Sequence, residues 1–313
     1  MSASLLLRLR WRGEAALAAV LFALCRALGP VRASNLGAAI LGRIGPILPV
    51  SRVADINLSI AFPDRDQGFR RATIRAMWEN LGRVGGELPN LPAIMARQGE
   101  PDLPPPDGPG WAVDGDAHVA PMRDAGGPGI LVSGHFGNWE VMPGAAARRG
   151  VGFALVYRAI GNPYLDAMIH RLRSAALGTG DLPLLPKGPV AARGALGHLR
   201  AGGYLGLLGD QKMNDGIAVP LFGRPAMTAP AAAQLALRLR CPLLMARCVR
   251  DGPARFRVVV EPALAHPAIG SAQADVAALT AAMNARFEAW ARERPAEWLW
   301  LHRRFDKALY RRG

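Results

Sequence analysis

The sequence predicts an α/β fold, in which a mostly parallel mixed sheet is flanked by helices and preceded by a membrane-associated helical segment. After Trp111, short apolar runs alternate with longer helical segments, as in successive βαβ units. The chain has 313 residues, of which 50% are hydrophobic, so a sizeable core is possible. The first 45 residues differ from the rest because arginines flank an uncharged apolar run.

Residues 1–45 are expected to form N-terminal, membrane-associated helices. Arg8, Arg10 and Arg12 precede an uncharged run of eleven residues, Ala15 to Cys25. This run is shorter than the roughly 20 apolar residues of a secure transmembrane span, and no convincing signal-peptide cleavage site follows it. We predict a helix over residues 4–29 that lies in, or dips into, the cytoplasmic face of a membrane. A buried helix of a soluble protein is the alternative.

Residues 46–110 are expected to form a helical segment followed by a proline-rich connector. Between Asp64 and Leu88 apolar residues recur near helical spacing with charged residues between them, which predicts an amphipathic helix. From Pro89 to Gly110 closely spaced prolines exclude a regular helix or a central strand. We place the start of the catalytic domain, residues 111–313, after this connector.

The catalytic domain is expected to alternate strands and helices. The predicted strands are residues 130–133, 153–157, 182–185, 204–208, 243–248 and 256–260. The predicted helices lie near residues 139–149, 163–177, 189–201, 228–239 and 272–294.

The charge of the chain favours a polyanionic partner. Its 38 basic and 24 acidic residues give a formal net charge of +14. Such a surface suits a nucleic acid, an anionic lipid face, an acidic carrier protein or a phosphorylated substrate. No nucleic-acid-binding signature is present, so we expect no nucleic-acid partner. Three cysteines without CxxC spacing predict neither a disulfide framework nor a zinc ribbon.

The strongest local signal lies at residues 129–140, Gly-Ile-Leu-Val-Ser-Gly-His-Phe-Gly-Asn-Trp-Glu. A strand followed by a glycine-bracketed turn places His135 at the carboxyl end of the strand, where ligands of open α/β sheets usually bind. On one continuous helix His135 and Glu140 would lie about 140° apart and could not meet. If Gly137 and Asn138 reverse the chain, Glu140 can face the imidazole, fix its tautomer and leave the other ring nitrogen as a base toward a hydroxyl.

Metal binding and a purely structural role are the other two interpretations of this pair. The spacing of His135 and Glu140 is not HExxH, and no third ligand is near in the sequence, so we expect no metal. The pair could also be purely structural, a histidine at a strand end bonded to a local carboxylate.

Other candidate substrate-binding residues also follow strand ends. Arg158 could hold a phosphate or stabilise the oxyanion of a thioester tetrahedral intermediate. Asp210 and Gln211 are expected to shape the same cleft, and Asn138 belongs to the turn. Near the C-terminus, residues 298–304 combine tryptophans with cations, which is typical either of an interfacial anchor or of core packing.

Several motifs occur together in a characteristic order. The first is His135-Phe136-Gly137-Asn138-Trp139-Glu140, of the form HX4E. The others are Asn57-Leu58-Ser59-Ile60-Ala61-Phe62-Pro63, Tyr157-Arg158 with Asn162-Pro163, Gly209-Asp210-Gln211, Val219-Pro220-Leu221-Phe222-Gly223 with Pro225 and Thr228, and Trp298-Leu299-Trp300-Leu301-His302-Arg303-Arg304-Phe305. Together they resemble the motifs of the lipid A biosynthesis lauroyl/myristoyl acyltransferases, which load secondary acyl chains onto Kdo-lipid A.

The resemblance implies an α/β acyltransferase fold, a single N-terminal membrane helix, and an enzyme at the cytoplasmic face of the cell inner membrane. It also implies an acyl-carrier-protein thioester as donor, a lipid A precursor as acceptor, no metal or organic cofactor, and catalytic roles for His135 and Glu140. Three rivals stay open. They are the same chemistry on a phosphoglycolipid, lysophospholipid or ornithine-type lipid, a thioester hydrolase, and a basic membrane-binding protein with a structural His–Glu pair.

Overall fold

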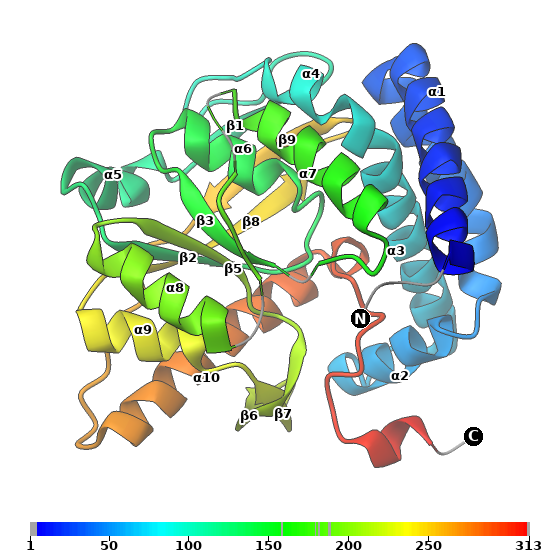
Figure 1. The fold of residues 1–313 in the computed structure, drawn as a ribbon. Coiled ribbons are helices and arrows are strands. Elements are labelled where there is room, and N and C mark those ends of the chain that lie inside the picture. The colour runs from blue at the N-terminus through cyan, green and yellow to red at the C-terminus, as the bar shows by residue number, and fades with distance from the viewer. Residues whose placement is uncertain (1–4, 158, 179, 181, 187–188, 312–313) are drawn as a thin grey trace.

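A seven-stranded sheet forms the centre of the computed structural model, which describes residues 5–157, 159–178, 180, 182–186 and 189–311 (Figure 1). Its strand order is β1-β9-β8-β2-β5-β3-β4, and every neighbouring pair is parallel except β8 and β9. The strands are β1 (Gly110–Asp114), β2 (Gly129–Ser133), β3 (Phe153–Tyr157), β4 (Leu184–Pro186), β5 (Tyr204–Leu208), β8 (Leu243–Arg250) and β9 (Arg255–Val260). The predicted fold class, a mostly parallel mixed sheet in an α/β fold, is confirmed.

Helices cover both faces of the sheet, with α4 to α7 above it and α8 to α10 below it in Figure 1. They are α4 (Leu91–Met95), α5 (Asp116–Asp124), α6 (Val141–Arg148), α7 (Pro163–Leu177), α8 (Pro189–Arg200), α9 (Ala231–Leu239) and α10 (Ala272–Glu293). Because strand side chains alternate, Ile130 and Val132 of β2 enter one hydrophobic cluster and Leu131 enters the other. The sheet is therefore buried on both faces, as parallel sheets usually are.

The N-terminal helix α1 (Leu5–Ile44) is bent sharply and doubles back on itself (Figure 1). Gly29 has non-helical dihedral angles (φ 75°, ψ 167°), and Pro30 follows it. The predicted helix over residues 4–29 therefore ends where the structure bends. The second half of α1, residues 30–44, packs on α3 (Gln67–Glu87) so closely that a Cβ on Gly82 would lie 2.1 Å from the carbonyl oxygen of Gly37.

Short elements connect the long ones. They are α2 (Ser51–Ala61), the 3₁₀ turns η1 (Gly45–Ile47), η2 (Leu88–Asn90), η3 (Pro295–Glu297) and η4 (Lys307–Tyr310), and the hairpin of β6 (Lys212–Leu221) and β7 (Arg224–Thr228). The connector contains the short helix α4, so the expectation that its prolines exclude a regular helix was wrong at Leu91–Met95; Pro92 is tolerated there because it lies in the first turn. The division into residues 1–45, 46–110 and 111–313 stays a prediction.

Candidate active site

Two neighbouring strands, β2 and β5, end at the candidate active site. Ser133 pairs with Leu208 at the carboxyl ends of these parallel strands, and the N–H of Gly209 donates to the carbonyl of Ser133 over 2.8 Å. His135 follows β2 and Asp210 follows β5, so the strand pairing brings the two residues together from positions 75 residues apart.

The carboxylate that the structure places against the imidazole of His135 is Asp210. Nδ1 of His135 lies 2.8 Å from Oδ1 of Asp210, and the backbone N–H of His135 donates to Oδ2 over 2.8 Å. The indole N–H of Trp298 donates to the same Oδ2 over 2.9 Å. Burial alone raises the pKa of Asp210, but the charge of His135 and these hydrogen bonds outweigh it, so the pKa lies below its usual range.

The ionised Asp210 decides which ring nitrogen of His135 carries the proton. A carboxylate can only accept, so Nδ1 must be the donor and Nε2 keeps a lone pair. Nε2 of His135 lies 3.3 Å from the side-chain nitrogen of Gln211, which also lies 3.2 Å from Nε2 of His302. An amide NH₂ has two hydrogens and can donate to both imidazoles. In its neutral form, His135 is therefore held with Nε2 as the ring nitrogen that can accept a proton.

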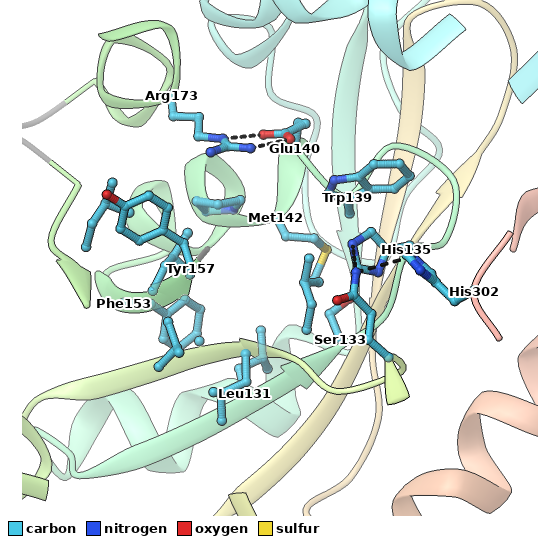
Figure 2. A pocket seen from close by; sticks show the side chains of 18 of the residues that line it. Leu131, Ser133, His135, Trp139, Glu140, Met142, Phe153, Tyr157, Arg173 and His302 are labelled. Carbon is cyan, nitrogen blue, oxygen red and sulfur yellow. Dashed lines mark hydrogen bonds and ion pairs between the residues drawn. The ribbon is translucent and has the colours of Figure 1, made fainter. Parts of the chain in front are cut away.

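Glu140 lies on another wall of the same cavity and pairs with Arg173 of α7 (Figure 2). Nε and one terminal nitrogen of Arg173 donate to the two carboxylate oxygens of Glu140, each over 2.6 Å. The turn does reverse as predicted, since Gly137 has φ +54° and a Cβ there would lie 2.1 Å from the carbonyl oxygen of Cys248. After the turn Glu140 faces α7, and Asp210 takes the place beside the imidazole that the sequence analysis expected Glu140 to fill.

Asn138 links the turn after β2 to α3 through hydrogen bonds of its side chain. It is fully buried, its side-chain N–H donates to Oε2 of Glu87 over 2.8 Å, and its Oδ1 accepts the backbone N–H of Glu140 over 3.1 Å. Glu87 of α3 is fully buried and also binds Arg250 and Ser34. Asn138 is not among the side chains that line the cavity, so its contacts fit a positioning role better than the predicted substrate contact. Arg158 lies outside the described residues.

The C-terminal segment completes the site. The N–H of Gly137 donates to the carbonyl of Glu297 over 3.0 Å, and the N–H of Leu299 donates to the carbonyl of His135 over 3.1 Å. Trp298 and Trp300 are buried, 3% and 1% exposed. Of the two interpretations of this segment, interfacial anchor or core packing, the tryptophans therefore fit core packing. Sequence reasoning missed His302 as a site residue. This histidine lies within the tryptophan- and arginine-rich motif, but the motif alone does not show that the segment folds back onto His135.

A cavity of about 570 Å³ opens beside His135. Figure 2 shows Leu131, Met142 and Phe153 among the side chains that line it, together with His135 and the pair of Glu140 with Arg173. The described side chains that line it are Leu131, Ser133, His135, Trp139, Glu140, Met142, Pro143, Phe153, Leu155, Val156, Tyr157, Ile160, Arg173, Leu184, Leu207, Leu208, Gln211, Lys212, His302 and Arg303. The site thus joins an imidazole whose Nε2 faces Gln211 to a cavity lined by both apolar and polar side chains.

Metal ligands do not gather anywhere in the part of the chain that the structure describes: it contains no group of three or more His, Cys, Asp or Glu residues placed to hold an ion. Chemistry at this site is therefore argued from His135 and its partners.

Comparison with known proteins identifies the family. The model of the bacterial lipid A biosynthesis acyltransferases matches residues 4–307, almost the whole chain. No curated protein sequence gives a significant match. The family match agrees with the fold, and it spans the HX4E turn, the residues that follow β5 and the C-terminal segment that closes the site. The chain therefore belongs to the bacterial lipid A biosynthesis acyltransferase family.

Proposed function

We propose that the protein transfers a fatty acyl chain, of the lauroyl or myristoyl type, from an acyl-carrier-protein thioester to a hydroxyl of a lipid A precursor. The observation that carries this proposal is the imidazole of His135, oriented by the buried carboxylate of Asp210 beside a cavity with apolar walls at Leu131, Met142 and Phe153. Such a base suits proton removal from a hydroxyl, and an apolar cavity suits a fatty acyl chain.

The proposed reaction is a direct transfer. The acceptor hydroxyl displaces the amide of Gln211 from Nε2 of His135 and gives its proton to that nitrogen as its oxygen attacks the thioester carbonyl carbon. The resulting tetrahedral intermediate collapses, the carbon–sulfur bond breaks, and the imidazolium returns the proton to the leaving thiolate. Asp210 stabilises the imidazolium that forms between the two proton transfers.

Oxyanion stabilisation is assigned to side chains. The backbone N–H groups of Phe136 and Gly137 already donate to the carbonyls of Gly134 and Glu297. Gln211, once displaced from His135, can donate toward a developing oxyanion, and a role of Arg158 there stays a prediction. The pair of Glu140 with Arg173 joins α6 to α7 at the cavity wall and keeps the acyl chamber in shape.

The membrane is the proposed location, with the enzyme at the cytoplasmic face of the inner membrane. The segment Leu5–Ile47 is long and apolar enough to cross a bilayer by length and composition. Its exposed apolar side chains include Leu5, Leu6, Leu17, Val20, Leu21, Leu24, Ile40 and Ile47. These side chains would otherwise face water, which favours contact with lipid.

An orientation in the plane of the membrane fits the contacts of α1 better than a span. The side-chain N–H of Asn162 donates to the carbonyl of Trp11 over 2.9 Å and to Glu14 over 3.0 Å, which fixes the first half of α1 to the catalytic half of the molecule. The uncharged run of eleven residues from Ala15 to Cys25 measures roughly 16 Å, about half of a hydrocarbon core. Lying flat, the helix keeps the arginines at both ends of the run among the headgroups.

Mass spectrometry of lipid A tests the function. Cells without the gene should lose one acyl chain from lipid A, and a plasmid copy should restore it, whereas a His135→Ala copy of equal abundance and thermal stability should not. Restoration by the His135→Ala copy would contradict the mechanism. Unchanged lipid A in the deletion strain would contradict the proposed acceptor, and a difference in the whole lipid extract would then identify another lipid.

A further inference from the structure

Two cations line the cavity close to the catalytic base. Lys212 directly follows Gln211, and Arg303 directly follows His302. Gln211 and His302 lie 3.2 Å apart beside His135. The two chain segments that meet at this contact therefore each contribute one cation to the lining of the cavity.

Both side chains also contact the C-terminal segment. Nζ of Lys212 donates to the carbonyl of Phe305 over 3.1 Å, which holds the ammonium against the segment that carries Arg303. An ammonium has three N–H groups, so this bond uses one of three donors. The guanidinium of Arg303 lies over the ring of Tyr310, 5.9 Å from its centroid. Stacking of this kind orients a guanidinium and leaves its N–H edge available to a ligand.

The charge of the lining is unbalanced. Within the described part of the cavity wall, Glu140 is the single lining carboxylate, and Arg173 binds both of its oxygens. Lys212 and Arg303 have no carboxylate partner among the ion pairs of the described residues. Two cations in the lining of one cavity favour a ligand that carries negative charge on several oxygens.

We propose that Lys212 and Arg303 form a subsite that binds a phosphate group of one of the two substrates. The inference rests on the proposed acyl transfer, since both substrates of such a reaction are phosphorylated: the lipid A precursor on its sugar, and the carrier protein on its phosphopantetheine arm. A phosphate offers oxygens to the guanidinium fork and to the ammonium at once. The acceptor is the better source, because Lys212 adjoins the residue that contacts the base, whereas the pantetheine arm separates its phosphate from the reacting thioester.

Equilibrium binding to the full-length protein in detergent tests the subsite without depending on turnover. Four ligands are compared: a phosphorylated lipid A precursor, the same lipid after removal of its phosphates, an acyl phosphopantetheine with an amide in place of the thioester, and the corresponding acyl pantetheine. The test variant is Lys212→Met with Arg303→Met. The matched control is Lys307→Met with Arg311→Met, which removes the same two charge types from exposed positions nearby that do not line the cavity.

The unmodified protein and the control variant should bind a phosphorylated ligand more tightly than its phosphate-free form. The Lys212→Met/Arg303→Met variant should lose roughly tenfold to a hundredfold in affinity for that ligand and little for the phosphate-free form. A loss confined to the lipid pair assigns the phosphate to the acceptor, and a loss confined to the pantetheine pair assigns it to the donor. Equal losses with and without phosphate, or no loss, would overturn the subsite, while the lipid A experiment above tests acyl transfer separately.

Discussion

The histidine at the end of β2 depends on a carboxylate from the neighbouring strand. Asp210 receives three hydrogen bonds, from the ring and backbone of His135 and from Trp298. Glu140, the acidic residue of the HX4E motif, is instead bound by Arg173. The two carboxylates therefore differ in what they hold: Asp210 orients the base, and Glu140 holds α7 against the cavity.

Exchanging each carboxylate for its amide separates these roles. We expect Asp210→Asn to lower kcat by about three to four orders of magnitude, because the amide can donate to Nδ1 and so favours the tautomer in which Nε2 carries the proton. Glu140→Gln should cost less in kcat and act more on KM for the acyl donor, because it loosens a cavity wall. Steady-state transfer assays measure both. A nearly active Asp210→Asn protein beside an inactive Glu140→Gln protein would restore Glu140 as the partner of His135.

The depressed pKa of Asp210 also predicts how stability depends on pH. Because the pKa is lower in the folded protein than in the unfolded chain, the ionised group stabilises the fold at pH values above the usual aspartate pKa of about 3.9. That contribution is lost as the pH falls toward the folded-state pKa. We expect the difference in unfolding free energy between the unmodified protein and Asp210→Asn to shrink as the pH is lowered from about 6 to about 3. A difference that stayed constant, measured by denaturant unfolding, would contradict this linkage.

Helix packing near the N-terminus depends on residues without side chains. On α3, a Cβ at Gly82 would lie 2.1 Å from the carbonyl oxygen of Gly37, and a Cβ at Gly86 would lie 2.2 Å from that of Ala33. Spacing of four residues places both glycines on one face of the helix, where they let the second half of α1 approach backbone to backbone.

A pair of substitutions on α3 tests this packing. Gly82→Ala should destabilise the protein by about 1–3 kcal/mol, because the added methyl group forces the two backbones apart. Gly85→Ala is the matched control on the same helix, since nothing lies within 4 Å of its Cβ position. It should be neutral or stabilising by up to about 1 kcal/mol, because alanine has the higher helix propensity. Denaturant unfolding in detergent measures both; equal effects would show that the close approach is unimportant.

Local sequence patterns predicted the helices and strands with regular apolar spacing. They did not predict the strands in which polar residues or prolines interrupt that spacing. The helices at 163–177 and 189–201 and the strands at 153–157 and 204–208 agree with α7, α8, β3 and β5 within a residue. The hairpin of β6 and β7 was missed because β6 begins with polar residues and because Pro220 and Pro225 interrupt its apolar pattern.

The partner of His135 could not be predicted from sequence, because it depends on strand order. Nothing local to Asp210 shows that β5 lies beside β2, and only that pairing brings its carboxylate to the imidazole. Within the turn that follows β2, Glu140 is the carboxylate nearest to His135 in the sequence, so the sequence analysis predicted it as the partner. Gln211 was placed correctly in the cleft, but its position between two imidazoles requires the C-terminal segment, which arrives from 91 residues away.

Exposed apolar side chains recur along α1, and the proposed membrane contact of this helix can be tested on them. Replacing Leu17, Leu21 and Leu24 with serine should move the protein from the membrane to the soluble fraction of lysed cells, because each exposed leucine contributes about 1.5–3 kcal/mol of apolar transfer. Leu103→Ser with Ile269→Ser, at exposed positions far from α1 in the sequence, is the control and should stay with the membrane. A triple variant that stays in the membrane fraction through a sodium carbonate wash would contradict the role of this face.

The hydrogen bonds between the C-terminal segment and the turn after β2 also order events during synthesis. His135, Gly137 and Asp210 each take a partner from residues 297–299, which leave the ribosome long after the strands that they complete. Because the N-terminus is made first, α1 is complete before the segment that supports His135 has been synthesised. A chain released before Glu297 would keep α1 but lack the hydrogen bonds that residues 297–299 make to His135, Gly137 and Asp210, so the site is complete only when synthesis is nearly finished.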